Sequence, residues 1–330
     1  MDTVERGNFW KTLNSFDGND VDAEMSLINK TIKYPRYLYR FRSINSNTLD
    51  GLRSNRLYFS SADKYDDPFD SFIYIDWGKV EKEITEEFKR IDVQNKELDI
   101  LQRTFNISPE IVSNLINQHN VDEWTKIGKN IIENTRRDIQ KDNLSICFSE
   151  EKLNEVLWLK YAGNHSGFLM EYDITDEASF LCGKSDECKN CLASIESHPL
   201  YPVYYSSEKY DATSYAKYTA INGLLKNLPV NIASAIRSAL PAMTWQRERI
   251  SLIKHKCHEY DKEWRMIHSS FNSENKRRPF IVWRPSSIIL GLRIQQADKN
   301  IICTLAREAG ISNIYQCFIN KSDELDTYMI

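Results

Sequence analysis

Residues 144–172 read LSICFSEEKLNEVLWLKYAGNHSGFLMEY, and this stretch indicates the class of fold. Residues 144–149 are mostly apolar and predict a buried strand. Residues 150–162 place apolar side chains at helical spacing, and residues 166–172 return to the pattern of an apolar strand. A strand, a helix and a second strand therefore follow one another directly along the chain.

The same mixture of strands and helices extends to both sides of this stretch. Further strands are predicted at 36–41, 56–60, 71–75, 203–206, 251–255, 263–268, 280–283, 288–292 and 314–318. Helical patterns occur at 47–53, 79–140, 208–248 and 297–309. Because the strands come in scattered pairs between helices of unequal length, we expect an α+β fold with mixed or antiparallel central sheets.

The pattern divides the chain into a lead-in and one domain. Residues 1–35 predict a helical lead-in that ends at a Tyr-Pro step, since the residue before a proline favours extended backbone. Residues 36–330 predict a single α+β domain. A helical insertion at 79–140 and a cysteine-bearing loop at 180–199 interrupt that domain.

Composition excludes several classes of protein. With 330 residues, 41% of them hydrophobic, the chain can bury a sizeable core without disulfides. Its 11 glycines argue against a turn-rich all-β fold and against glycine-rich phosphate loops. The 43 basic and 47 acidic residues nearly balance, unlike those of a general nucleic-acid or membrane binder. With no long apolar run and no apolar signal core, we expect a cytoplasmic protein without membrane contact.

Two arginines alternate along the first predicted strand. Arg40 and Arg42 share one face of that strand, and adjacent guanidiniums repel each other unless they meet an anion. Phosphate and carboxylate match the planar fork of arginine. The alternative is that both arginines are exposed, or that they pair with the acidic cluster that follows Ser60. That cluster consists of Asp66, Asp67 and Asp70.

Hydroxyl, imidazole and carboxylate groups recur at the ends of predicted elements. Ser149 ends a buried strand, where it caps the next helix or faces a ligand. Tyr161 and His165 lie at the connection to the following strand, a place where binding groups often sit. Asp261 and Glu263 are two residues apart, so they share one face of a strand and predict an acid–base pair. The alternative for these two carboxylates is a salt-bridged strand edge.

Cysteine spacing predicts a zinc site. A C-x2-C step, a further cysteine and a histidine make a Cys3His set, which suits tetrahedral zinc. The set consists of Cys182, Cys188, Cys191 and His198. Cys257 or His258 can replace the histidine of the set. Without zinc, the cysteines are thiols of a polar loop.

Five segments occur together and in order: LYRFR, LYFSSADKYDDPFD, SICFSEE, LWLKYAGNHSGF and KEWR. In combination they resemble domain of unknown function 2971, a mostly bacterial family. The resemblance covers about residues 37–292. Two features depart from the pattern of the family. Asp66 stands where the family often has asparagine, and the cysteine loop is not typical of it.

The opening strand, short helix, strand and loop are also similar, more distantly, to the start of ADP-ribosyltransferase-like folds. The resemblance implies that Arg40 or Arg42 grips the phosphate or nicotinamide ribose of NAD, and that Ser149 fixes the ribose. It implies that Glu263 hydrogen-bonds the ribose 2′-hydroxyl and stabilises the positive charge that develops as nicotinamide leaves. Ser60 is a further cofactor-binding candidate.

The same resemblance implies an acceptor for the ADP-ribose group. Tyr161, His165 and Asp261 are the candidates for handling it, and RNA, DNA or protein are the acceptors that we expect. A toxin or phage-defence effector, with an antitoxin or regulatory protein as its partner, fits this hypothesis.

Two other classes of function stay open. The first is a non-catalytic binding or regulatory module of a defence system, in which the arginine and aspartate clusters are structural. The second is a metal-dependent nuclease that binds a divalent cation through Asp66, Asp67 and Asp70. Turnover of NAD distinguishes the transferase from the module, and dependence on a divalent metal distinguishes the nuclease.

Overall fold

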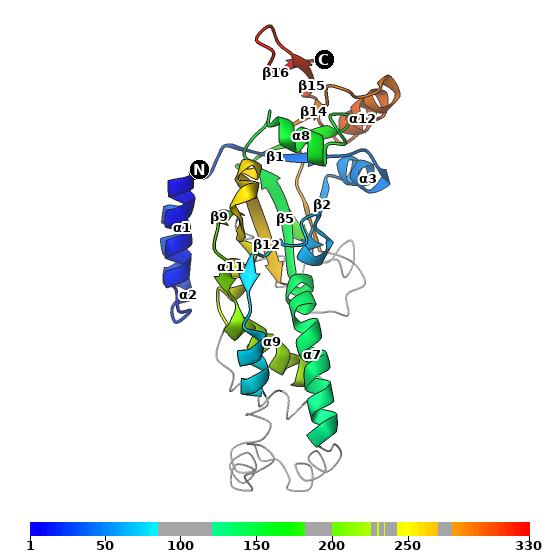
Figure 1. The fold of residues 1–330 in the computed structure, drawn as a ribbon. Helices are drawn as coiled ribbons and strands as arrows, with labels where there is room; N and C mark the ends of the chain where they lie inside the picture. Colours follow the sequence, from blue (N-terminus) through cyan, green and yellow to red (C-terminus); the bar gives the residue numbers. More distant parts are fainter. Residues whose placement is uncertain (85–120, 182–199, 226–229, 231–233, 235–242, 270–278) are drawn as a thin grey trace.

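The computed structural model of the chain describes residues 1–84, 121–181, 200–225, 230, 234, 243–269 and 279–330. In this part the chain folds around one large sheet, with helices on its sides and a smaller sheet against one face (Figure 1). None of the helices in these ranges is long and apolar enough to cross a membrane.

The elements have bounds close to those that the sequence predicts. The helices are α1 Thr3–Ser15, α2 Val21–Thr31, α3 Ser46–Ser54, η1 Ala62–Lys64, α7 Val121–Asp142, α8 Glu155–Tyr161, α9 Thr213–Leu225, α11 Gln246–Ser251, η3 Lys256–Asp261 and α12 Gln296–Glu308. The strands of the main sheet are β1 Tyr37–Arg42, β3 Ser60–Ser61, β5 Asn143–Ser149, β6 Phe168–Asp173, β8 Leu200–Pro202, β12 Glu263–Ser269, β14 Ser287–Leu290, β15 Ile314–Ile319 and β16 Leu325–Met329. The other strands are β2 Arg56–Tyr58, β4 Ile73–Tyr74, β7 Ser179–Leu181, β9 Tyr204–Ser206, β10 Tyr210–Asp211, β11 Ile253–His255 and β13 Phe280–Val282.

The main sheet is mixed. Within the described ranges its strands follow the order β16–β15–β14–β6–β1–β5–β12–β8, and β3 pairs with β5 off this path. Neighbours in the sheet run antiparallel, except β14 and β15, which are parallel. Parallel neighbours need a crossover connection, and α12 supplies it. The mixed sheet and its helices confirm the predicted α+β class.

The two faces of the main sheet bury different side chains because successive residues of a strand point to opposite faces. Leu38 and Phe148 lie on the face that carries the main hydrophobic core. Phe41 and Leu169 lie on the other face, where they pack with Trp158 of α8. This division decides which candidate residues can meet.

The strands β1 and β5 separate after a short contact. Their register pairs Tyr39 with Ser149. Toward the N-terminal end of β5, the short strand β3 replaces β1 as the neighbour of β5, and Ser60 pairs with Ser145. The sequence Ser-Ser at 60–61 follows a strand directly, so the chain moves from the small sheet to the main sheet within a few residues.

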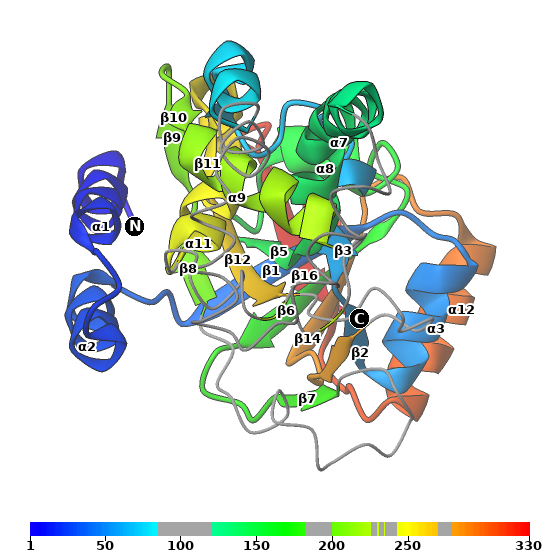
Figure 2. The same cartoon turned by 90° about the horizontal axis from the view of Figure 1, so that it is seen from below.

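The helices of the predicted lead-in, α1 and α2, are present, and α1 is tied to the sheet. Arg6 of α1 is buried, and its Nη1 donates 2.8 Å hydrogen bonds to the carbonyls of Val203 and Glu263. Its Nη2 lies 3.1 Å from Glu150 Oε1. Figure 2 shows α1 and α2 on one side of the sheet and the pair α3 and α12 on the other.

The predicted helical insertion is helical at both of its described ends. Residues 77–84 and α7 are helices, and α9 packs along α7 (Figure 1). Apolar residues from these helices form a second hydrophobic cluster, separate from the core of the main sheet. Its members include Val80, Ile84, Ile139, Ala216 and Ala220. Residues 85–120 lie outside the described ranges.

Three local predictions need correction. The strand expected at 251–255 is shorter, because α11 extends to Ser251 and β11 begins at Ile253. The helix expected from about residue 150 begins at Glu155, and its N-cap is Asn154 rather than Ser149. The strands β7, β8, β10 and β16 were not predicted, and β10 at Tyr210–Asp211 lies within the helix expected at 208–248. β7 and β8 are three residues each, too short to show alternation, and β16 reads LDTYM, without a regular alternation of apolar and polar residues.

Replacing Gly167 by alanine is expected to destabilise the fold by about 2–4 kcal/mol, because a buried backbone clash has no simple relief. A Cβ atom at this position would lie 2.1 Å from the backbone oxygen of Arg42, on the neighbouring strand β1. Urea denaturation of both proteins measures the change in the free energy of unfolding.

Gly7→Ala is the matched control for this substitution. Gly7 lies within α1, and a Cβ atom there would meet nothing within 4 Å. Alanine at this site is expected to stabilise the protein by about 0.5–1 kcal/mol through its helix propensity. Equal effects of the two substitutions would contradict the tight approach of β1 to Gly167.

Candidate functional site

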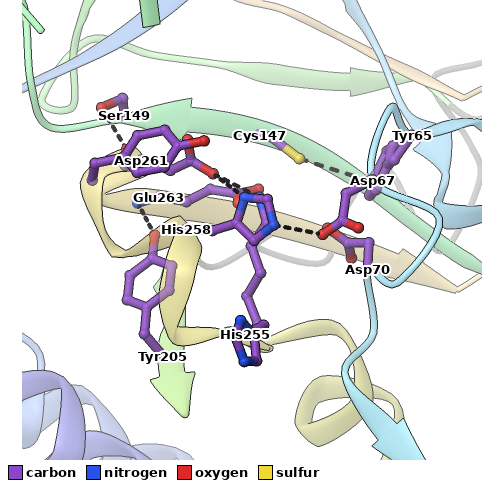
Figure 3. Close-up of polar contacts among 12 residues, drawn as sticks. Tyr65, Asp67, Asp70, Cys147, Ser149, Tyr205, His255, His258, Asp261 and Glu263 are labelled. Atoms are coloured by element: carbon purple, nitrogen blue, oxygen red, sulfur yellow. Dashed lines mark hydrogen bonds and ion pairs between the residues drawn. The ribbon is translucent and has the colours of Figure 1, made fainter. Parts of the chain in front are cut away.

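A network of buried charges surrounds the predicted acid–base pair (Figure 3). Lys254 of β11 lies between the two carboxylates, with its Nζ 2.7 Å from Asp261 Oδ2 and 3.0 Å from Glu263 Oε2. All three side chains are at most one-tenth exposed. The ammonium group therefore holds Asp261 and Glu263 together. The shared strand face that the sequence predicted is wrong, because Asp261 ends η3, Lys262 has left-handed backbone and β12 begins only at Glu263.

Arg265 extends the network to the loop before β4. Its Nε donates to Glu263 Oε1 at 2.7 Å, and its Nη1 and Nη2 donate to the two oxygens of Asp70 at 2.8 and 2.6 Å. Nη1 also donates to the carbonyl of Ser251 at 2.6 Å. A two-pronged pair of this kind is the strongest form of an arginine–carboxylate contact.

These contacts determine the protonation of Glu263. Burial by itself raises the pKa of this carboxyl, but the charges of Arg265 and Lys254 outweigh it and hold the pKa well below its usual value. Glu263 is therefore ionised, and both of its oxygens accept hydrogen bonds from cations. A carboxylate in this state stabilises its neighbours, and each of its oxygens already accepts from a cation.

His258 connects Asp261 to the acidic loop after η1. Its Nε2 lies 3.2 Å from Asp67 Oδ2, and its Nδ1 lies 3.8 Å from Asp261 Oδ2 (Figure 3). Burial, and then the charge of Lys254, lower the pKa of His258, while burial raises the pKa of Asp261. The pKa values of the two groups are thus shifted toward each other.

Ser149 faces Glu263 across neighbouring strands, but its hydroxyl is occupied. The register pairs the two residues between β5 and β12. The hydroxyl donates to the carbonyl of Asp261 at 2.8 Å and accepts from the N–H of Glu151 at 3.0 Å. Tyr161 packs against the cluster of Phe41 and Trp158, and burial and then the charge of Asp261 raise its pKa to about 12.

Arg40 and Arg42 lie on the opposite face of the sheet from Ser149 and Glu263. Residues that face each other in an antiparallel pair point to the same side of the sheet. Because Tyr39 pairs with Ser149, and Ser149 pairs with Glu263, the side chains of all three share one face. Alternation along β1 then turns both arginines to the other face, where the guanidinium of Arg40 lies 5.8 Å from the ring centre of Phe148.

The two arginines are desolvated and have no acidic partner among the described residues. Arg40 is 9% exposed, and its Nη1 is buried without a hydrogen-bond partner. Arg42 is half-buried, and no described residue forms an ion pair or a hydrogen bond with it. Burial lowers the pKa of Arg40, and burial and then the charge of Arg40 lower the pKa of Arg42 to about 9.

The structural alternatives considered for the arginine pair are therefore wrong. Neither arginine is exposed. Asp70 pairs with Arg265 and Asp67 pairs with His258, while Asp66 is exposed. The alternative for Asp261 and Glu263 also needs correction. They are salt-bridged, but β12 has β5 and β8 on its two sides and is not an edge strand.

The remaining candidates lie elsewhere. The ring of His165 stacks on Trp158 at 6.3 Å, in the turn before β6, and no described contact joins it to the charge network. Ser60 contributes its carbonyl, which accepts a hydrogen bond from the hydroxyl of Tyr65. Of the zinc alternatives, Cys257 has its Sγ 2.9 Å from His255 Nδ1.

The predicted zinc set itself falls outside the described ranges. Its four members are Cys182, Cys188, Cys191 and His198. In the part of the chain that is described, no three histidine, cysteine or acidic side chains gather in a way that would hold a metal ion.

Sequence reasoning missed Lys254 and the roles of Arg265 and His258. The signal for Lys254 was a lysine beside apolar residues in a predicted strand, at Ile253-Lys254. A buried lysine needs anionic partners, which directs attention to the nearby Asp261 and Glu263. The pairing of Arg265 with Asp70, 195 residues away, had no local signal.

Asp70→Asn is expected to destabilise the protein by about 3 kcal/mol, because it removes one partner of a buried ion pair. Asp66→Asn, at an exposed position in the same loop, is the control and should change stability by less than about 0.5 kcal/mol. Chemical denaturation compares the two proteins with the wild type. A negligible effect of Asp70→Asn would show that Arg265 does not depend on this carboxylate.

The site can now be compared with known proteins. A family model described as "Protein of unknown function (DUF2971)" matches residues 157–266, from α8 to β12. The matched segment contains Lys254, Asp261, Glu263 and Arg265, four of the residues of the charge network. No curated protein and no solved structure matches the chain. Over residues 157–266 the chain matches the DUF2971 family model, in agreement with the resemblance seen in its sequence.

Proposed function

We propose that this protein is a binding module whose ligand is an anion held by Arg40 and Arg42. The observation that carries the proposal is the buried, unpartnered Nη1 of Arg40 beside a second unpaired guanidinium. A buried charge without a partner lowers the stability of the folded chain by several kcal/mol. Such a charge is retained where a ligand from outside the chain supplies the missing partner. An anionic ligand is the simplest partner for two adjacent cations.

The charge network supports a binding role over a catalytic one. ADP-ribosyl transfer needs a guanidinium, the hydroxyl of Ser149 and the carboxylate of Glu263 in one cavity. The sheet register puts Arg40 on the other face from both groups. Lys254 and Arg265 also occupy the oxygens of Glu263. In our proposal the network is structural, and the arginine pair carries the function.

ADP-ribosyl transfer from NAD to RNA, DNA or protein is the second candidate. It is favoured by the direct pairing of Ser149 with Glu263 on neighbouring strands. A toxin or phage-defence role, with an antitoxin or regulatory partner, belongs to either candidate and stays a prediction, as does a cytoplasmic location. The nuclease hypothesis has no such support, because Asp67 and Asp70 pair with different partners.

Thermal denaturation with a panel of oxyanions tests the binding proposal. At constant ionic strength, at least one of phosphate, sulfate and acetate is expected to raise the melting temperature of the wild type by mass action. The increase should disappear in Arg40→Met and Arg42→Met. Arg53→Met is the control, since Arg53 is an exposed arginine of α3. An anion effect of equal size in all four proteins would overturn the proposal.

Incubation with NAD and cell extract separates the two candidates. A binding module releases no nicotinamide, in the wild type or in Glu263→Gln. Release by the wild type that is lost in Glu263→Gln would replace our proposal by ADP-ribosyl transfer. Because Glu263 is buried in the network, circular dichroism must first establish that the variant is folded.

A further inference from the structure

We infer that the group bound by Arg40 and Arg42 is the dianionic phosphate of a phosphomonoester. The inference rests on the proposed function and names the class of ligand. It follows from three features of the site: its charge, the kind of hydrogen-bonding groups around it, and the side from which it can be reached.

Charge is the first feature. Arg40 and Arg42 are alternate residues of one strand, so their Cα atoms are roughly 6–7 Å apart and their side chains point the same way. Burial lowers the pKa of Arg42 most, and repulsion by the charge of Arg40 lowers it further. A single carboxylate would leave one of the two charges uncompensated. A phosphate dianion balances both, and its oxygens can accept from both planar forks.

The surrounding groups are the second feature, because they are donors or apolar rings. Trp283 packs against Phe148 and Tyr172, the aromatic residues beside Arg40, and its buried Nε1 also lacks a partner. The hydroxyl of Tyr172 donates to the sulfur of Met170, which is a weak acceptor. A site with unsatisfied donors is completed by a ligand that only accepts hydrogen bonds, and an ionised phosphate is such a ligand.

Access is the third feature. Arg42 is more exposed than Arg40 and lies at the end of β1, beyond the pairing of Tyr39 with Ser149. At that point β5 takes β3 as its neighbour. A phosphate can therefore contact Arg42 first, while the rest of the ligand remains on the solvent side. One phosphate group fits a site of two arginines better than a nucleic-acid strand does. The net charge of -4 also argues against binding a long polyanion.

The test is a calorimetric titration of the full chain with methyl phosphate, a minimal phosphomonoester, and with sulfate and acetate, between pH 5 and pH 8. The second pKa of a phosphate group is about 6, so its dianion becomes about tenfold rarer at pH 5. Phosphate affinity is therefore expected to fall about tenfold from pH 8 to pH 5. Sulfate is a dianion throughout and should bind equally at both pH values, whereas acetate should not bind.

The protein itself should contribute little to this pH dependence. Arg42 stays charged below pH 8, because its pKa is about 9. Burial raises the pKa values of Tyr65 and Tyr172, and it raises that of Cys147 to about 11, so these neighbours stay neutral. The sulfate titration measures any change that comes from the protein instead of the ligand.

Variants connect the binding to the residues. Arg40→Met and Arg42→Met are expected to weaken phosphate binding more than tenfold, and Trp283→Phe by a smaller factor, while Arg53→Met keeps the wild-type affinity. Arg40→Met should also melt at a higher temperature than the wild type without ligand, because it removes an unpaired buried charge. This increase reports that the variant folds and that Arg40 has no partner in the free protein.

Each outcome bears on a different claim. Acetate binding as tight as phosphate binding would overturn the phosphate inference and leave the anion-binding proposal in place. Phosphate binding that does not change with pH would do the same. If none of the three anions binds, or if the arginine variants bind like the wild type, both the inference and the proposed function fail.

Discussion

The guanidinium of Arg265 makes the contacts on which the rest of this structure depends. It is 1% exposed, and its donors reach Asp70 in the loop before β4, Glu263 on its own strand and the carbonyl of Ser251 at the end of α11. A charge buried this deeply is tolerated only when its hydrogen bonds are complete. The loop, the strand and the helix end must therefore stay together, which also determines where Lys254 and Asp261 meet Glu263.

Arg265 and Arg40 are both buried in the same sheet, but they differ in how completely their guanidinium groups are paired. Arg265 is surrounded by carboxylates and is complete in the free chain, while Arg40 has an unpartnered Nη1 on the other face. Full pairing holds a fold together, and incomplete pairing lowers the stability of the free protein. Such a loss of stability is tolerated where the unpaired charge serves binding, because a ligand that supplies the missing partner recovers the lost free energy.

Part of the site could be predicted from local pattern. Alternation of side chains correctly placed Arg40 beside Arg42, since residues two apart share a face of a strand. Asp261 and Glu263 also come together, but through Lys254, because Asp261 lies in η3 and not in β12. The alternative that Arg40 and Arg42 pair with the acidic cluster of Asp66, Asp67 and Asp70 failed for a reason that local pattern does not contain. Asp70 is adjacent to β12 in space and reaches Arg265, which is distant from it in sequence.

The sequence by itself determined the α+β class, the positions of most strands and helices, and the resemblance to DUF2971, because these depend on periodicity and on local motifs. Only the tertiary structure decided which face of the sheet each candidate occupies relative to the others. The reason is that register between strands is a long-range property: the pairing of Tyr39 with Ser149, and of Ser149 with Glu263, joins residues more than one hundred positions apart. A shift of one residue in that register would have brought Arg40 to the side of Glu263.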